Sequence, residues 1–284
     1  MIKTSFMTSP SPGGSGVGLF GQMKVEKGLG LFKGDLEKAF QIANELRYDG
    51  LEIALANPFE INKSKLINLV EKYHINISSF GTGGAAVRDG LTFTSLDESI
   101  RESAVERIRH FIDMASHFRA VVVISLVRGG IIEDAEKSKE RMTACLKLCS
   151  EYAHKKNVFL AFEPVNRFQE DFFHSILDCK KYFEEVNLPN LGMLIDSFHM
   201  NMEDNDMWGN IKEASHSIVH VHYADSNRLA PGRGHFDFYQ MTKTLHEIGY
   251  TGYLSAEILP YPDSYTAAEE SIKKVKGCLS ALKE

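Results

Sequence analysis

The chain has 284 residues, of which 43% are hydrophobic and 25% are charged, and its formal net charge is −6. This composition excludes an intrinsically disordered chain and a disulfide-stapled miniprotein, and the acidic balance disfavours a nucleic-acid partner. The chain contains no apolar run long enough to span a bilayer, and Met1–Pro10 lacks a signal-peptide pattern, so we expect a cytoplasmic protein with no membrane partner.

Short β-branched or aromatic runs alternate with longer segments of helical period along the whole chain. The runs predict strands at Ile2–Met7, Gly50–Leu55, Ile75–Gly81, Ala120–Val127, Val158–Phe162, Leu191–Ile195, Ile218–His222 and Tyr253–Ile258. Helices are predicted at Leu36–Leu46, Lys65–Tyr73, Ile100–Phe118, Ala135–Lys155, Ile176–Val186, Met207–Ser215, Tyr239–Ile248 and Ala268–Leu282. This alternation predicts an α/β fold with a single domain, residues 1–284, in the form of a (β/α)8 TIM barrel; a doubly wound open sheet is the alternative.

Two further features are expected to carry no chemistry. The four cysteines lie in helical patterns, with Cys145 and Cys149 on one helix face, and we interpret them as buried, reduced thiols. Gly16–Gly21 matches G-x-G-x-x-G, but no helical pattern follows it as a dinucleotide site requires. We therefore interpret Pro10–Gly34 as an irregular loop near a barrel mouth.

Metal-capable side chains stand at the ends of the last four predicted strands. Glu163, Asp196, His222 and Glu257 each close an apolar run, one strand–helix unit apart. Because the carboxyl ends of barrel strands surround one mouth, these side chains should converge. A single acidic residue at a strand end is usually a helix cap or an ion-pair partner, but three clustered carboxylates require a neutralising cation. Oxygen-rich ligation with one imidazole suits Mn²⁺, Mg²⁺ or Co²⁺.

Several motifs carry a resemblance to a known family. They are Glu-Pro-Val-Asn-Arg (163–167), Asp-Ser-Phe-His-Met-Asn (196–201), His-Val-His-Tyr-Ala-Asp-Ser-Asn-Arg (220–228) and Gly-His-Phe-Asp-Phe (234–238), with Gly-Thr-Gly-Gly (81–84) and Leu-Val-Arg-Gly (126–129) extending the likeness. With these motifs the chain resembles the xylose-isomerase-like superfamily, and within it the D-tagatose/D-psicose 3-epimerase group. The resemblance implies a TIM barrel with one Mn²⁺-type ion held by Glu163, Asp196, His222 and Glu257.

The resemblance also implies roles for the side chains around the ion. Glu163 and Glu257 would form the acid/base pair, and His199 and Arg228 would bind substrate oxygens. In such chemistry one carboxylate removes the proton from the carbon beside a metal-bound ketone, which gives a cis-enediolate, and the other protonates the opposite face. His199 is also consistent with a place behind the metal ligands, and Arg228 with an anion anchor or a plain salt bridge.

Other polar residues of the predicted barrel have more than one interpretation. Arg128 follows the fourth strand, and one interpretation is that it recognises a substrate anion. Glu52 lies within the second strand, where it either lines the barrel interior or makes a structural hydrogen bond. The free-ketose epimerases carry a glutamate six residues beyond the first metal glutamate, where this chain has Gln169. A neutral amide there favours an anionic keto-sugar, such as a keto-uronate or keto-gluconate, unless Glu170 restores the charge.

The sequence thus predicts a divalent-metal-dependent isomerase that inverts the carbon next to a ketone in a ketose or keto-sugar acid. The same metal site would also serve an aldose–ketose isomerase or a hydroxypyruvate-type isomerase. A non-catalytic sugar-binding barrel is an alternative of another class. An apurinic-site endonuclease relative is a further one, although residues 78–83 and 125–129 supply no extra metal-binding histidines. The expected partner is a small sugar or sugar acid, and the family resemblance allows a homodimer or homotetramer.

Overall fold

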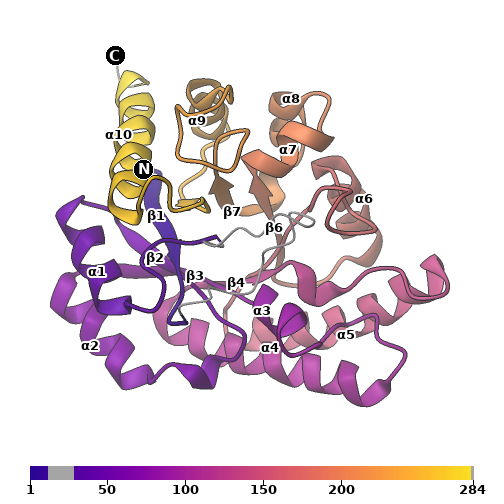
Figure 1. Cartoon of the computed structure of the whole chain (residues 1–284). Coiled ribbons are helices and arrows are strands. Elements are labelled where there is room, and N and C mark those ends of the chain that lie inside the picture. The colour runs from indigo at the N-terminus through magenta and orange to yellow at the C-terminus, as the bar shows by residue number, and fades with distance from the viewer. Residues whose placement is uncertain (12–28, 283–284) are drawn as a thin grey trace.

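Parallel strands close into a barrel in the computed structural model, which describes residues 1–11 and 29–282 (Figure 1). Each strand pairs with the next along the chain, and β8 pairs with β1 to complete the ring. The strands are β1 (Lys3–Thr8), β2 (Gly50–Ala54), β3 (Asn76–Gly81), β4 (Val121–Ile124), β5 (Leu160–Phe162), β6 (Leu191–Asp196), β7 (Ile218–Tyr223) and β8 (Tyr253–Ala256). The predicted TIM-barrel fold is confirmed.

Helices surround the strands and begin at polar capping residues (Figure 1). The side chains of Asp35, Asp97 and Asp134, for example, each accept a backbone N–H of the first helical turn. The helices are α1 (Leu36–Glu45), α2 (Lys63–Tyr73), α3 (Gly83–Val87), α4 (Glu98–Phe118), α5 (Ala135–Lys155), α6 (Ile176–Val186), α7 (Ser197–Glu203), α8 (Met207–Glu213), α9 (Phe238–Glu247) and α10 (Ser264–Ala281). Three-residue 3₁₀ turns cover Pro58–Glu60, Leu126–Arg128 and Ser215–Ser217.

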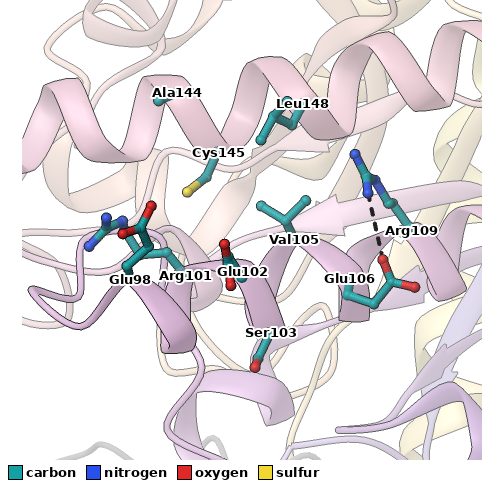
Figure 2. Close-up of a pocket in the computed structure, with 10 residues that line it drawn as sticks. All are labelled: Glu98, Arg101, Glu102, Ser103, Val105, Glu106, Arg109, Ala144, Cys145 and Leu148. Atoms are coloured by element: carbon teal, nitrogen blue, oxygen red, sulfur yellow. Dashed lines mark ion pairs between the residues drawn. The ribbon is translucent and has the colours of Figure 1, made fainter.

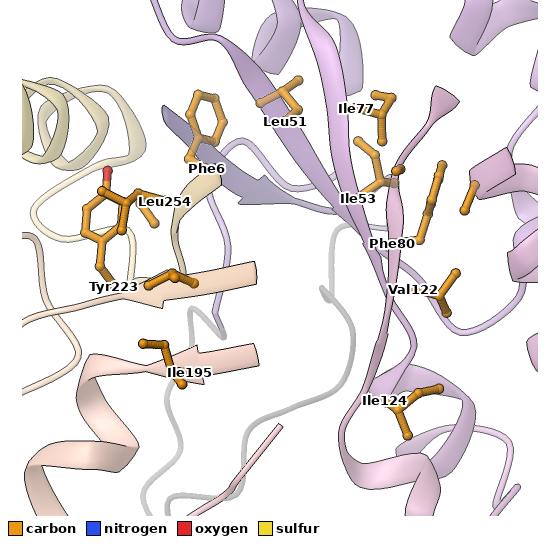
Figure 3. Close-up of a cluster of buried hydrophobic side chains, with 14 of the residues drawn as sticks. Phe6, Leu51, Ile53, Ile77, Phe80, Val122, Ile124, Ile195, Tyr223 and Leu254 are labelled. Atoms are coloured by element: carbon orange, nitrogen blue, oxygen red, sulfur yellow. The ribbon is translucent and has the colours of Figure 1, made fainter. Parts of the chain in front are cut away.

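The alternation of side chains along the strands divides the interior into two regions. Outward-facing residues such as Phe6, Leu51 and Phe80 pack in the main apolar core between the strands and the helices (Figure 3). Inward-facing residues fill the barrel lumen. Burial of large side chains in the outer core fixes the strand register, and the register decides which side chains reach the lumen.

The lumen changes from apolar to polar around its circumference. Val123, Ala161 and Leu194 form a small apolar cluster on β4, β5 and β6. On β7 and β8 the corresponding inward positions, two residues before the strand-end ligands, hold His220 and Ser255, which are both buried. Polar groups inside a barrel need internal partners, and the partners of His220 belong to the site described below.

The structure differs from the sequence prediction at a few segments. The predicted strand Ala120–Val127 ends at Ile124, because the chain turns into the 3₁₀ segment Leu126–Arg128. Helices α3 and α7 were not predicted, because each is shorter than two turns and has no extended apolar stripe. The predicted glycine motif Gly16–Gly21 and most of Pro10–Gly34 lie outside the described residues.

The structure bears on the predicted state of the cysteines and on the search for membrane-spanning helices. All four cysteines are free and buried, as expected for reduced structural thiols. Within residues 1–11 and 29–282, no helix combines the length and the apolar character that a membrane crossing requires.

Candidate metal centre

The ends of four neighbouring strands bring the predicted ligands together. Asp196 is the last residue of β6 and lies opposite His222 of β7 in the strand register. Glu163 and Glu257 follow β5 and β8 directly, and their backbone N–H groups continue the ladder to Ile124 and Tyr223, at 3.0 and 3.2 Å. Each functional side chain is therefore held by sheet hydrogen bonds at its own backbone.

The four ligand atoms lie close enough to share one ion. One atom from each of Glu163, Asp196, His222 and Glu257 lies within 4.8 Å of all the others. His222 Nδ1 is 3.4 Å from Glu163 Oε1, 3.4 Å from Glu257 Oε2 and 4.0 Å from Asp196 Oδ2. The first three residues are buried, and the Glu257 side chain is 15% exposed, so the cluster opens to solvent on the Glu257 side.

The donor set fits a divalent cation. Glu163 Oε1 and His222 Nδ1 are buried and have no hydrogen-bond partner among the described residues, although they lie near each other. A buried polar atom without a hydrogen-bond partner is costly, and an ion at this point would contact both atoms. Three carboxylates and one imidazole are the ligand types of Mn²⁺ or Mg²⁺ sites. The residues present thus fit the metal that the sequence predicts.

Arg228 lies against the same cluster and offsets part of its negative charge. Its Nη1 donates to Asp196 Oδ2 at 2.5 Å, and its Nη2 contacts the Glu257 carboxylate. The guanidinium also stacks on Phe198, with Cζ 4.8 Å from the ring centroid, and is itself buried. Its Nε is buried and has no hydrogen-bond partner in the described part of the chain.

One ring nitrogen of His199 faces the cluster, and the other faces Asn166. Asn166 Nδ2 donates to His199 Nδ1 at 2.8 Å, and Asn166 Oδ1 accepts the Phe168 N–H, which fixes the orientation of the amide. Nδ1 is therefore an acceptor and Nε2 carries the proton. Nε2 lies 3.8 Å from Asp196 Oδ2 and 4.0 Å from Glu163 Oε1.

Burial and charge have opposite effects on the two histidines of the site. Burial lowers the pKa of His199, and the nearby carboxylates only partly oppose it, so the ring is neutral and Nε2–H is a hydrogen-bond donor. Burial also disfavours the His222 cation, but the Glu52 and Glu163 carboxylates outweigh it and raise the pKa of His222 to about 10. The carboxylates around His222 thus favour a positive charge at this position.

Glu52 belongs to a second layer beneath the ligands. It reaches from β2 to β7, where His222 Nε2 lies 3.1 Å from its Oε1 and 3.0 Å from its Oε2. His220 and Ser79 also contact its Oε2, at 3.0 and 2.7 Å. Burial raises the pKa of Glu52, but His222 and His220 outweigh it and hold the pKa well below its usual range. Glu52 is an anion that lines the barrel interior.

The cavity at the barrel mouth contains most of the predicted substrate-binding residues. Glu163, Glu257, His199, Arg228 and Gln169 all line it. Gln169 is thus placed where its neutral side chain can contact a ligand. Its neighbour Glu170 is buried and is not among the described lining residues of this cavity. Compensation of Gln169 by the charge of Glu170 stays a prediction.

Arg128 is placed differently from the other predicted substrate-binding residues. It is fully buried, and its Nη1 and Nη2 donate to the backbone carbonyls of Glu163 and Phe172, the second at 3.2 Å. Its guanidinium stacks on Phe162, with Cζ 4.9 Å from the ring centroid. These contacts hold the chain that follows β5. Contact of Arg128 with a substrate anion stays a prediction.

A larger cavity lies elsewhere, on the outer side of the barrel between α4 and α5 (Figure 2). It has a volume of about 650 Å³ and shares no lining residue with the cavity at the mouth. Charged residues of α4, such as Glu98 and Arg101, line it together with Cys145 of α5. Burial raises the pKa of the Cys145 thiol, which makes this cysteine a poor nucleophile.

The fold and the site together define a class of protein: a closed TIM barrel with a candidate divalent-metal centre at the carboxyl ends of its strands. The chain belongs to the xylose isomerase-like TIM barrel family, whose model matches residues 40–278. The predicted family resemblance is confirmed.

Curated relatives cover most of the chain. A probable ketose 3-epimerase from Synechocystis is 27% identical over 243 residues, which is 83% of each protein. A 3-dehydro-D-guloside 4-epimerase from Escherichia coli is 23% identical over 257 residues, covering 86% of this chain and 94% of that protein. Both names are those of carbohydrate epimerases, which confirms the expected class of protein, an isomerase-type carbohydrate enzyme.

A solved structure supports the fold independently. The crystal structure of a D-allulose 3-epimerase from Methylomonas, in complex with D-allulose, superposes with a TM-score of 0.78 at 22% identity. The match covers 98% of both chains. The whole described barrel therefore has the architecture of this enzyme.

Proposed function

We propose that Glu163, Asp196, His222 and Glu257 hold one divalent ion, Mn²⁺ in first place and Co²⁺ or Mg²⁺ as alternatives. The enzyme then epimerises the carbon next to a ketone in a ketose or keto-sugar acid. The observation that carries this proposal is a pair of unpartnered buried atoms, Glu163 Oε1 and His222 Nδ1, which lie 3.4 Å apart. Their residues belong to a described cluster of four whose ligand atoms lie within 4.8 Å of one another. The names of the curated relatives support the reaction class.

Glu163 and Glu257 are the proposed acid/base pair. They line the same cavity from β5 and β8, which are not neighbours in the barrel, and so approach a substrate from different sides. When bound, the ion supplies Lewis-acid polarisation of the ketone. One carboxylate accepts the proton from the neighbouring carbon, and the C–H electron pair forms the double bond of a cis-enediolate. The other carboxylate donates a proton to the opposite face, which inverts the carbon.

His199 and Arg228 stabilise the negative charge that develops on the substrate oxygens. His199 presents a neutral Nε2–H, because Asn166 occupies Nδ1. Arg228 offers guanidinium donors from a buried position next to Asp196. Donors that are fixed before the reaction stabilise developing charge with little reorganisation.

The cavity wall and the names of the relatives support the proposed substrate class. Gln169 lines the cavity without charge, and this favours a sugar that carries its own negative charge or a glycoside over a free ketohexose. The named substrate of the Escherichia coli relative is a keto-glycoside, in which the inverted carbon also lies beside a ketone. The proposed chemistry is the same for a ketose and for a keto-glycoside, because in each of them only the carbon next to the ketone exchanges a proton.

Solvent deuterium uptake tests this function directly. The Mn²⁺-loaded enzyme is incubated in D₂O with a free ketohexose, a 3-keto-glycoside and a keto-hexuronate, and the products are analysed by NMR. We expect deuterium at a carbon next to the ketone, with both configurations present. Deuterium at the former carbonyl carbon, with an aldose product, would identify an aldose–ketose isomerase instead. Absence of uptake from every compound would contradict an enzymatic function and favour a sugar-binding barrel.

Two variants connect the uptake to the proposed residues. Glu163→Gln and Glu257→Gln each remove one proton-transfer group from the cavity, and we expect each to abolish inversion. Because an amide neither accepts nor donates the proton, the loss should exceed 10²-fold, the usual contribution of general acid–base catalysis. A variant with unchanged uptake would remove that carboxylate from the mechanism.

A further inference from the structure

The barrel lumen contains a buried hydrogen-bond network around Glu52. Glu52 comes from β2, Ser79 from β3, and His220 and His222 from β7, so the network crosses the lumen. All four residues are buried, with exposed fractions of 1% or less. The carboxylate accepts from Ser79 Oγ at 2.7 Å, from His220 Nε2 at 3.0 Å and from His222 Nε2 at 3.0 Å.

This network ends on the ring of a proposed metal ligand. His222 uses Nε2 for both Glu52 oxygens, at 3.0 and 3.1 Å, and turns Nδ1 toward Glu163 and Glu257. An imidazole can give a lone pair to an ion at only one nitrogen while the other carries the proton. A carboxylate at Nε2 holds the proton there, leaves the lone pair on Nδ1 and fixes the plane of the ring.

We propose that Glu52 is the positioning residue of the metal centre, which orients His222 and fixes its tautomer, and that Ser79 and His220 hold the Glu52 carboxylate in place. The proposal rests on the proposed metal function of His222. It assigns Glu52 no contact with substrate, because Glu52 lies beneath the ligands and is not among the described residues that line the mouth cavity.

The geometry gives each supporting residue a separate contribution. Ser79 Oγ and His220 Nε2 both contact Oε2 of Glu52 and lie 3.1 Å from each other, whereas Oε1 contacts only His222 among the described hydrogen bonds. Loss of Ser79 Oγ removes one donor and leaves the charge of Glu52. Loss of the Glu52 charge weakens every hydrogen bond of the network at once. A positioning role therefore predicts graded effects on metal affinity.

Mn²⁺ affinity measures this role without relying on turnover. Free Mn²⁺ is counted by electron paramagnetic resonance while the ion is titrated into the wild type, Glu52→Gln and Ser79→Ala. We expect the dissociation constant to rise about 10–100-fold in Glu52→Gln and by a smaller factor in Ser79→Ala. Saturating Mn²⁺ should restore most of the Glu52→Gln turnover, whereas Glu163→Gln should stay inactive at any Mn²⁺ concentration. Asp204→Asn, which changes a partly buried carboxyl outside the lumen, is the matched control and should bind like the wild type.

The outcomes separate this proposal from the proposed function. A wild type that binds no Mn²⁺ would overturn the metal centre itself. A wild type that binds one ion, with unchanged affinity in a folded Glu52→Gln, would overturn only the positioning role. If Glu52→Gln does not fold, Ser79→Ala decides: a several-fold weaker affinity at unchanged thermal stability of the metal-free protein supports the proposal, and wild-type affinity contradicts it.

Discussion

The hydrogen bonds of a single side chain decide which of its atoms is available for chemistry. Asn166 donates to His199 Nδ1, so the single ring proton of neutral His199 sits on Nε2. This nitrogen faces Asp196 and Glu163. The sequence places His199 near the site but leaves its role open, because the spacing to Asp196 suits a substrate donor as well as a supporting residue. In the structure His199 lines the mouth cavity, and its role stays a prediction.

Substitution of His199 distinguishes the two roles. In His199→Asn the shorter side chain places no donor where Nε2–H stood, so we expect kcat/KM to fall about 10²–10³-fold, the loss typical of one donor to a developing oxyanion. Steady-state kinetics and a Mn²⁺ titration check this. Metal affinity should stay within a factor of two or three of the wild type. A large loss of affinity for Mn²⁺ would instead place His199 behind the metal ligands.

Asp204 gives a residue-scale prediction about pH. Burial raises the pKa of Asp204 to about 6, and its Oδ2 has no partner in the described structure. The folded state therefore binds the proton more tightly than the unfolded state, and stability falls as pH rises from about 4 to about 6. Asp204→Asn should raise the free energy of unfolding at pH 8 by on the order of 1 kcal/mol. Thermal melts of both proteins at pH 4 and pH 8 test this: an equal difference at the two values would exclude the titration of Asp204 as its cause.

At the scale of elements, the segments that follow the strands hold the site in place. Arg128 follows β4 and bonds the backbone carbonyls of Glu163 and Phe172, so it connects two consecutive strand–helix units. The guanidinium group of Arg128 also stacks on the Phe162 ring. The backbone of Glu163, a proposed metal ligand, is therefore held by a residue of the preceding unit, and the segments that follow β4 and β5 are joined.

Arg128→Lys breaks this connection while it keeps the charge. A lysine ammonium group cannot hydrogen-bond both carbonyls in the fixed geometry of a guanidinium group, and it loses the stacking on Phe162. We therefore expect the free energy of unfolding to fall by about 1–3 kcal/mol. We expect kcat to fall for neutral and anionic substrates by the same factor, because Glu163 is displaced for both. Kinetics with a keto-hexuronate and a neutral ketose check this. A loss confined to the anionic substrate would assign Arg128 to substrate recognition.

The sequence predicts the elements and the convergence of the four strand-end side chains better than it predicts the network beneath them. The ligands are visible because each closes a strand, and the repeating unit of the barrel alone brings strand ends together. Glu52 sits between Leu51 and Ile53, and this alternation indicates an inward position. Its partners on β3 and β7 are distant in sequence, so only the closed barrel identifies them.

At the scale of the whole molecule, the residues that stabilise the barrel and the residues of the candidate site lie in different regions. The large apolar core lies outside the strands (Figure 3). The lumen holds the buried Glu52 carboxylate and its partners. Three carboxylates in one cluster repel one another, and Arg228 and protonated His222 compensate them in part. An ion that binds the folded state alone then stabilises the entire barrel.

Mn²⁺ should therefore raise the melting temperature of the protein. At a free concentration 100-fold above the dissociation constant, the expected stabilisation is about 2.7 kcal/mol. Differential scanning calorimetry with Mn²⁺ and with a chelator measures the shift, which should be several degrees. Asp196→Asn, which lacks one ligand charge, should show a much smaller shift. An equal shift in both proteins would indicate that Mn²⁺ binds elsewhere.

The most direct measurement is anomalous diffraction at the manganese edge from crystals soaked in Mn²⁺. The account predicts one strong peak at the barrel mouth, about 2 Å from ligand atoms of Glu163, Asp196, His222 and Glu257. A peak between Glu52 and His220, or no peak near these four side chains, would contradict it.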